Sequence, residues 1–129
     1  MAVIRKIIDV AAAPEFVWDA LRAVGALHHR LVPGFVIDTF MDGPARIVTF
    51  DNGMTAREVI VSVDDSMRRV CYFVDNPNLA HHSASAEVFA FDGGSRIVWT
   101  CDVLPDAAAA GIEPMMARGA EAMAAHFGR

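Results

Sequence analysis

The sequence predicts an α+β fold in which a curved, seven-stranded antiparallel sheet wraps around one long C-terminal helix. Residues 2–10 and the stretch from 35 to 104 divide into short segments of β-branched and aromatic side chains, with Asp, Asn, Gly and Pro between them. Residues 106–127 form the one long segment with a helical pattern. At a rise of about 1.5 Å per residue, this helix would be roughly 33 Å long.

The first part of the chain predicts one strand followed by two short helices. Residues 2–10 are rich in Val and Ile, and the charges among them argue against a signal peptide. Pro14 suits the first turn of a helix, which Gly25 would interrupt. A second short helix is expected over residues 26–31, before the Pro-Gly pair at 33–34.

Six further strands are expected, at residues 35–41, 45–51, 54–63, 69–75, 81–91 and 95–104. The turns between them are short, and several contain the Asn-Gly and Asp-Gly pairs that are typical of hairpins. Short connections join antiparallel neighbours, so these strands should form a meander. A sheet of this length must curl, and the last helix is the element able to fill its concave side.

The predicted C-terminal helix has an apolar face with few bulky side chains. Asp106 is a suitable N-cap, and Gly128 is a suitable end. Pro114 either kinks this helix or marks its true start, and segment 111–114 is the expected hinge near a cavity mouth. The face itself consists of thioethers, small residues and few others: Ile112, Met115, Met116, Gly119, Ala120, Met123 and Phe127. Such a face either meets a close neighbour or borders a cavity.

The composition limits the classes of function. The chain has 129 residues, a net charge of −5 and 54% hydrophobic residues, with no basic stripe for nucleic acid. No apolar run reaches the roughly 18–20 residues of a membrane-spanning helix, so no membrane insertion is expected. We therefore expect one domain over residues 1–129 in the cytoplasm, with Cys71 and Cys101 reduced. The high mean hydropathy of +0.34 suggests a cavity, a subunit interface or both.

No metal site or cofactor is expected. The adjacent histidines 28–29 would point about 100° apart on a helix, and histidines 81–82 would point to opposite faces of a strand. The sequence contains no HExxH, CxxC or GxSxG motif and no glycine-rich phosphate loop.

Several local motifs occur in an order typical of one superfamily. They are Ala-Pro-Glu-Phe-Val-Trp at 13–18, Gly-Ala-Leu at 25–27, Pro-Gly at 33–34, Glu58 before Asp-Asp at 64–65, and Val-Trp-Thr at 98–100. In this order the chain resembles the START-like SRPBCC superfamily, in its bacterial polyketide cyclase/dehydrase-like branch. The resemblance covers essentially the whole chain. It implies a helix-grip fold that holds a small hydrophobic molecule, aromatic, polyketide- or lipid-like, between the sheet and the C-terminal helix.

The resemblance also bears on Glu58. It implies that this carboxylate points into the cavity, whereas alternation alone would turn the opposite, valine-rich face of strand 54–63 inward. An inward Glu58 would share its face with Ser62 and leave the valines outward, which suggests a homodimer. Glu58 would then serve as an acid, a base or a ligand anchor, or would pair with a nearby arginine.

The remaining site candidates follow from strand alternation. His82, Ala84 and Ala86 share the small-residue face of strand 81–91, with His82 at the rim. Arg46 either reaches inward towards Glu58 or a ligand, or is solvated at the end of its strand. The residues expected to contact the ligand are Arg46, Val48, Phe50, Ala84, Ala86, Met115, Met116 and Met123.

Three hypotheses about function stay open at this point. In the first, Glu58 and His82 act as an acid–base pair in a cofactor-free cyclisation or dehydration of a bound substrate. In the second, the protein is a non-catalytic carrier or sensor. In the third, it is a dimeric interaction module with a vestigial cavity.

Overall fold

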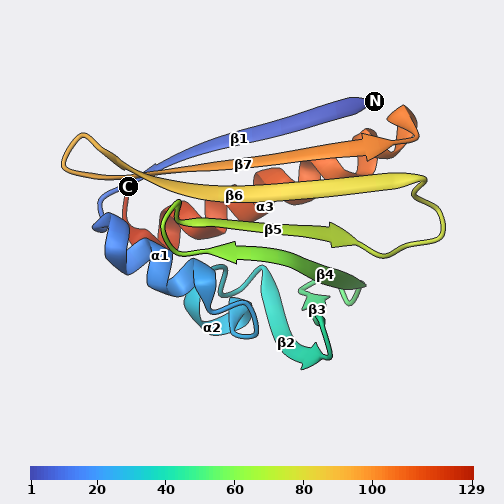
Figure 1. The fold of residues 1–129 in the computed structure, drawn as a ribbon, viewed down its shortest axis with the longest axis horizontal. Coiled ribbons are helices and arrows are strands. Elements are labelled where there is room, and N and C mark those ends of the chain that lie inside the picture. The colour runs from blue at the N-terminus through green and yellow to red at the C-terminus, as the bar shows by residue number, and fades with distance from the viewer.

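The computed structural model describes residues 1–129, and its strands form one seven-stranded antiparallel sheet (Figure 1). The order of the strands in the sheet is β1-β7-β6-β5-β4-β3-β2, so the last strand lies beside the first and the others follow as a meander. The bounds are β1 Ala2–Val10, β2 Val36–Asp42, β3 Ala45–Phe50, β4 Thr55–Asp64, β5 Arg69–Val74, β6 His81–Phe91 and β7 Gly94–Leu104.

The long helix α3 (Ala109–Phe127) runs along one face of the sheet, and the short helices lie at one end of it (Figure 1). These are α1 (Pro14–Arg22) and α2 (Leu27–Arg30), which connect β1 to β2. The predicted helix-grip arrangement is confirmed. None of the helices is both long and apolar enough to cross a membrane.

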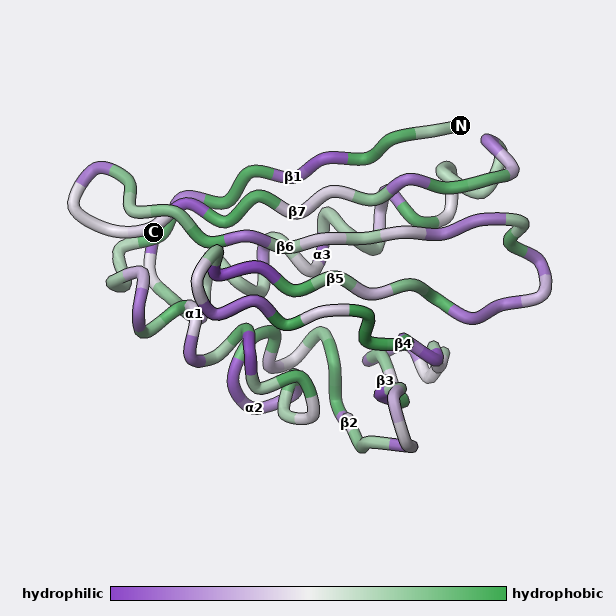
Figure 2. Tube along the Cα trace, in the orientation of Figure 1, coloured by the Kyte–Doolittle hydropathy of each residue, from purple (hydrophilic) through white to green (hydrophobic).

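Strand alternation determines which side chains face α3. Hydrophobic and hydrophilic stretches follow one another along β1 (Figure 2), but burial alternates there: Ile4 and Ile8 are buried, whereas Val3 and Ile7 are exposed. On β6, Ala84, Ala86 and Val88 are buried, whereas Ser83 and Phe89 are exposed, as the sequence predicts. The inner face of β6 is therefore lined by small side chains.

The fourth strand departs from strict alternation. The register between β4 and β5 shifts between Ile60 and Ser62, which makes Val61 the extra residue of a β-bulge. Glu58 is buried on the inner face, but Ser62 pairs across the sheet with Cys71 on the outer face. The prediction that Ser62 shares the face of Glu58 is wrong, because a single bulged residue reverses the phase of alternation.

The start of the C-terminal helix also differs from the prediction. A 3-10 turn, η1 (Asp106–Ala108), precedes α3, and no side chain caps either element. Asp106 instead pairs with the N-terminal amine at 3.1 Å, so its assignment as N-cap is wrong. Gly128 does end the helix, with a positive φ of 89° and its N–H donated to the carbonyl of Ala124. The helix continues through Pro114.

The outer face of the sheet mixes exposed apolar side chains with ion pairs. Val61 is 63% exposed there. The Arg96 Nε to Asp9 Oδ1 distance is 2.7 Å, and the Arg69 Nε to Glu87 Oε1 distance is 3.8 Å. The homodimer stays a prediction, which the mass of the protein in solution tests.

Candidate functional site

A cavity of about 380 Å³ lies between the inner face of the sheet and α3, and most of the residues that line it are hydrophobic. Residues from β3, β4, β5, β6, β7 and α3 contribute, together with Leu21 of α1 and Leu27 of α2. Its volume lies within the roughly 300–1,000 Å³ of small-molecule sites.

The two glycines of α3 show why space remains on one part of the helix. A Cβ on Gly119 would lie 2.9 Å from Cζ3 of Trp99, so helix and sheet are in close contact there. A Cβ on Gly111 would meet no atom within 4 Å. The apolar face of α3 therefore does both things that the sequence allows. It packs closely against the sheet around Gly119, and it borders the cavity from Gly111 to Met116.

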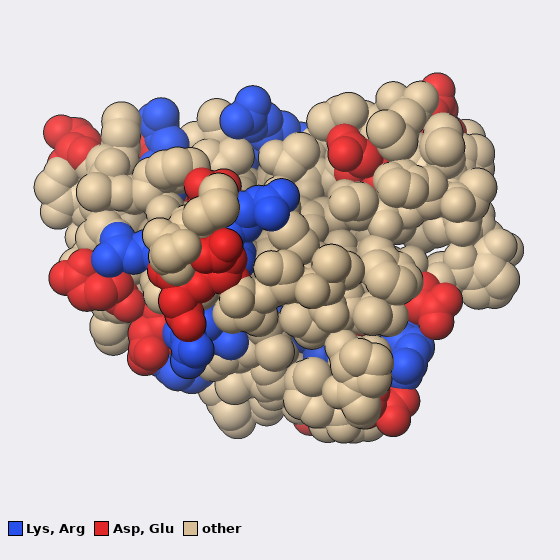
Figure 3. Space-filling view, in the orientation of Figure 1, with Lys and Arg blue, Asp and Glu red and all other residues tan.

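The mouth of the cavity is marked by the exposed residues of its lining. They are Met54 and Thr55 after the β3–β4 turn, Asn76 in the β5–β6 loop, and Gly111 in the first turn of α3. Most of the charged side chains visible in Figure 3 lie towards the end of the molecule that carries α1 and α2, and fewer lie towards the β5–β6 loop. Charged side chains also lie close to the mouth, since Arg57 forms ion pairs with Asp42 and with Asp75, the neighbour of Asn76 in the chain.

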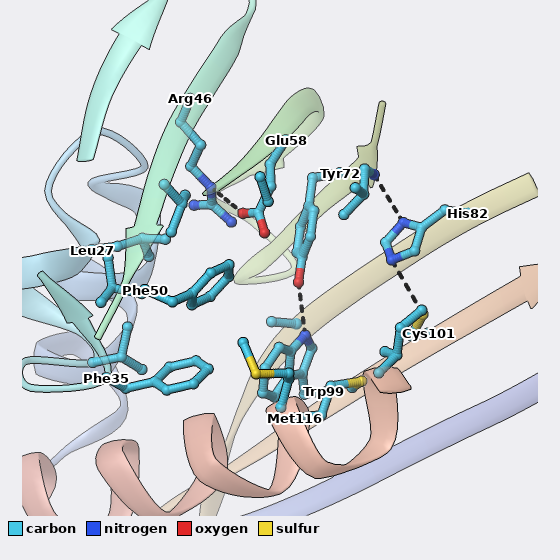
Figure 4. A pocket seen from close by; sticks show the side chains of 18 of the residues that line it. Leu27, Phe35, Arg46, Phe50, Glu58, Tyr72, His82, Trp99, Cys101 and Met116 are labelled. Atoms are coloured by element: carbon cyan, nitrogen blue, oxygen red, sulfur yellow. Dashed lines mark hydrogen bonds and ion pairs between the residues drawn. The ribbon is translucent and has the colours of Figure 1, made fainter. Parts of the chain in front are cut away.

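A buried ion pair forms the polar end of the cavity. Arg46 of β3 and Glu58 of β4 are cross-strand neighbours, and the Arg46 Nε donates to Glu58 Oε1 at 2.7 Å (Figure 4). The two residues are only 5% and 8% exposed. Glu58 thus points inward, as the family resemblance implied. The valine pattern alone would have predicted the opposite face to point inward. An arginine at this depth is stable because the carboxylate compensates its charge.

Tyr72 lies between the ion pair and the opposite wall (Figure 4). The Arg46 Cζ is 4.9 Å from the centroid of its ring, and its hydroxyl accepts a hydrogen bond of 3.0 Å from the Trp99 Nε1. Burial, and next the nearby charge of Glu58, raises the pKa of Tyr72. The hydroxyl therefore keeps its proton at neutral pH.

His82 lies on the other side of Tyr72 from Glu58, and both of its ring nitrogens have partners (Figure 4). The backbone N–H of Val74 donates to Nδ1 at 2.9 Å, and Nε2 is 3.3 Å from the Cys101 Sγ. Burial, and next the neighbouring His81, lowers the pKa of His82. Since Nδ1 accepts, the neutral ring carries its hydrogen on Nε2, which donates to the sulfur.

Cys101 is a thiol, not a thiolate. Burial, followed by the charge of Asp102, raises its pKa to about 11. The His82 Nε2 already carries a hydrogen, so it cannot take the thiol proton. The Cys101–His82 contact therefore lacks the thiolate that a cysteine nucleophile requires. The structure contains no group of three or more His, Cys, Asp or Glu side chains that could hold a metal ion.

Nearly all residues selected from the sequence line the cavity: Arg46, Val48, Phe50, Glu58, His82, Ala86, Met115, Met116 and Met123. Ala84 does not line the cavity, although it is buried in a cluster with three residues that do, Tyr72, Cys101 and Met116. Glu58 and His82 have different partners and form no hydrogen bond with each other. The structure therefore does not assemble them as an acid–base pair.

Tyr72 and Trp99 are two polar residues of the site that do not follow from the sequence pattern. The alternation within strand 69–75 does not indicate which face Tyr72 occupies, but Tyr72 lies opposite Ala84 in the antiparallel register and so shares its inner face. No local pattern assigns Trp99 to a ligand site, but this residue lines the cavity. Pairing strand 69–75 against the small-residue face of strand 81–91 would have been the signal for Tyr72.

A long helix gripped by a curved sheet, with an apolar cavity between them, defines the helix-grip class of fold. The sequence matches the family described as "Polyketide cyclase / dehydrase and lipid transport" over residues 1–128, and the chain belongs to this family. Family and fold together suggest ligand binding in a hydrophobic pocket. None of the curated protein sequences compared with the chain matches it.

Solved structures share the fold at low sequence identity. The protein XoxI from Bacillus cereus has a TM-score of 0.84 and 19% identity, with 98% of this chain and 96% of that chain covered. The protein Ara h 8.0201 has a TM-score of 0.72 and 17% identity, with 98% of this chain and 97% of that chain covered. Norcoclaurine synthase from Thalictrum flavum, in complex with dopamine and hydroxybenzaldehyde, has a TM-score of 0.64 and 16% identity, covering 99% and 89%.

Proposed function

We propose that the protein binds one small, mainly apolar molecule in the cavity, with the polar end of that molecule at Arg46, Glu58 and Tyr72. The observation that carries this proposal is the cavity of about 380 Å³ with its mainly hydrophobic lining. Such a lining with a few convergent polar groups is typical of small-molecule sites. The family, which includes lipid transport, supports the same function.

The contacts of the polar residues favour a carrier or sensor over an acid–base enzyme. Glu58 is engaged by Arg46, and the free lone pair of His82 is taken by the backbone N–H of Val74. An acid–base enzyme needs a group that exchanges a proton at the substrate, with a partner in hydrogen-bond reach. The proposal therefore concerns binding, and cyclisation or dehydration is not part of it.

Binding can be tested with the uncharged fluorescent dye N-phenyl-1-naphthylamine and with native mass spectrometry of protein purified from its own host. We expect the dye to become fluorescent with saturation at one molecule per chain. We also expect a co-purifying small molecule that the dye displaces. Absence of both signals would contradict the proposal and favour an interaction module.

Two neighbouring substitutions locate the binding site. Gly111 lines the mouth, and a side chain there meets open space, so Gly111→Trp should obstruct entry and weaken dye binding at least tenfold. Ala110 is exposed and outside the lining, so Ala110→Trp serves as the matched control and should leave binding unchanged. Equal dye affinities for the two variants would show that the dye binds elsewhere.

A further inference from the structure

We infer that the cavity selects an uncharged ligand with a carbonyl-type oxygen, and that this oxygen accepts a hydrogen bond from the Tyr72 hydroxyl. The inference rests on the proposed function and deepens it, since it names the chemical class of the ligand. Ketones, aldehydes, esters and quinones with an apolar body belong to this class.

The contact between Tyr72 and Trp99 fixes the role of the hydroxyl. An indole N–H can only donate, so the Tyr72 oxygen is the acceptor in the 3.0 Å hydrogen bond from Trp99 Nε1. The hydroxyl proton must then point away from Trp99. No side chain or carbonyl of the chain accepts it, although Tyr72 is only 8% exposed and lines the cavity. A buried donor without an acceptor is unfavourable, so a ligand oxygen at this position is favoured.

The charges around the cavity exclude a second class of ligand. Arg46 and Glu58 compensate each other, and the Tyr72 hydroxyl, the His82 ring and the Cys101 thiol are all uncharged at neutral pH. An anionic ligand such as a fatty acid would therefore enter without a free countercharge, or would have to separate Arg46 from Glu58. Both routes leave a buried charge unpaired, which is costly.

Three naphthalene derivatives of similar shape test separately the need for an acceptor oxygen and the need for an uncharged ligand. They are 2-acetylnaphthalene, with a carbonyl acceptor; 2-ethylnaphthalene, with no acceptor; and 2-naphthoate, with a negative charge. Each is measured by displacement of N-phenyl-1-naphthylamine. We expect the ketone to bind roughly threefold to tenfold more tightly than the hydrocarbon, as one net hydrogen bond provides. Naphthoate should bind at least tenfold more weakly than the ketone.

Two variants assign the preference to Tyr72. Tyr72→Phe should bind both uncharged probes with the affinity that wild type shows for 2-ethylnaphthalene. Thr55→Val removes another hydroxyl from the lining of the same cavity, at its exposed mouth, and should keep the preference for the ketone. Trp99 is a positioning residue here, so Trp99→Phe should reduce the preference without abolishing dye binding.

The infrared carbonyl stretch of bound 2-acetylnaphthalene provides a direct readout. A hydrogen bond from Tyr72 lowers this frequency, and Tyr72→Phe should raise it to the value found in an apolar solvent. If Tyr72→Phe does not fold, the wild-type frequency alone decides, because a value equal to that in an apolar solvent overturns the inference.

The outcomes distinguish this inference from the proposed function. Dye binding without any preference for the ketone, or a preference that survives in Tyr72→Phe, overturns the inference and leaves the proposed function intact. Naphthoate binding as tight as that of the ketone overturns the selection of uncharged ligands. Failure to bind the dye or any of the three probes overturns both proposals.

Discussion

Gly119 of α3 lies so close to the Trp99 ring that no side chain fits between them. A Cβ at position 119 would be 2.9 Å and 3.0 Å from two atoms of the indole, and 3.3 Å from the Phe35 ring. Eight residues earlier, Gly111 of the same helix borders open space. The helix therefore packs tightly against the sheet near its middle and leaves the cavity open near its start.

This contrast predicts opposite effects of the same substitution. Gly119→Ala forces the half-buried Trp99 ring and the buried Phe35 ring to move, and overpacking of this kind costs about 1–3 kcal/mol. Gly111→Ala meets no obstacle and gains about 0.5–1 kcal/mol from helix propensity. Because Gly119→Ala gains the same propensity, the two variants should differ in the free energy of unfolding by about 1–3 kcal/mol. Urea denaturation of both measures this difference.

Equal stabilities of the two variants would contradict the close packing at Gly119. The accompanying observation is tryptophan fluorescence, since Trp99 contacts the added methyl group in Gly119→Ala and not in Gly111→Ala. Its emission should change in the first variant only.

The fold was predictable because its signals are local. The Asp-Gly and Asn-Gly turns set the hairpins, and Pro14 and Gly25 bracket the first helix region as expected. The boundary of α3 was not predictable from Asp106, because that carboxylate pairs with the N-terminal amine, which is distant in the sequence.

The site was predictable only in part because strand direction depends on register. The small residues of β6 indicated its inner face, but the bulge at Val61 has no clear sequence signal. The direction of Glu58 came from the resemblance and not from periodicity. Tyr72 and Trp99 meet across strands that are not adjacent, and local patterns carry no information on such contacts.

Because the ion pair between Arg46 and Glu58 is buried, removing either partner alone should strongly lower the free energy of unfolding. Arg46→Met leaves Glu58 buried without its countercharge, which costs about 3–5 kcal/mol. The double substitution Arg46→Met/Glu58→Leu replaces the pair by apolar side chains and should recover most of this loss. Urea denaturation of the wild type, both single variants and the double variant gives the coupling energy.

An exposed ion pair provides the control for this cycle. Arg96 and Asp9 pair across β7 and β1 on the outer face, where water screens them. Arg96→Met should therefore lower the free energy of unfolding much less than Arg46→Met does. A double variant no more stable than Arg46→Met would show that the buried contact is not an ion pair of this kind.

His82 predicts that the protein loses stability on mild acidification. Its Nδ1 accepts the Val74 N–H, so protonation would set two N–H groups against each other, and burial lowers the pKa of His82 below its usual value of about 6.5. Between pH 6.5 and the lowered pKa of His82, the unfolded chain therefore binds more protons than the folded protein. The free energy of unfolding must fall as the pH falls through this window, and is unaffected by His82 above it.

Thermal melting at pH 8, 6.5 and 5 tests this dependence. His82→Gln keeps an acceptor for the Val74 N–H but does not titrate, so its melting temperature should fall less between pH 6.5 and 5 than that of wild type. His126 is exposed on α3, and His126→Gln should keep the wild-type dependence. The carboxylates with a lowered pKa, such as Asp9 in its hydrogen bond with Arg96, lose their contribution only below about pH 4 and do not overlap with this window. Identical pH profiles for His82→Gln and wild type would show that His82 is not held neutral by its contacts in the fold.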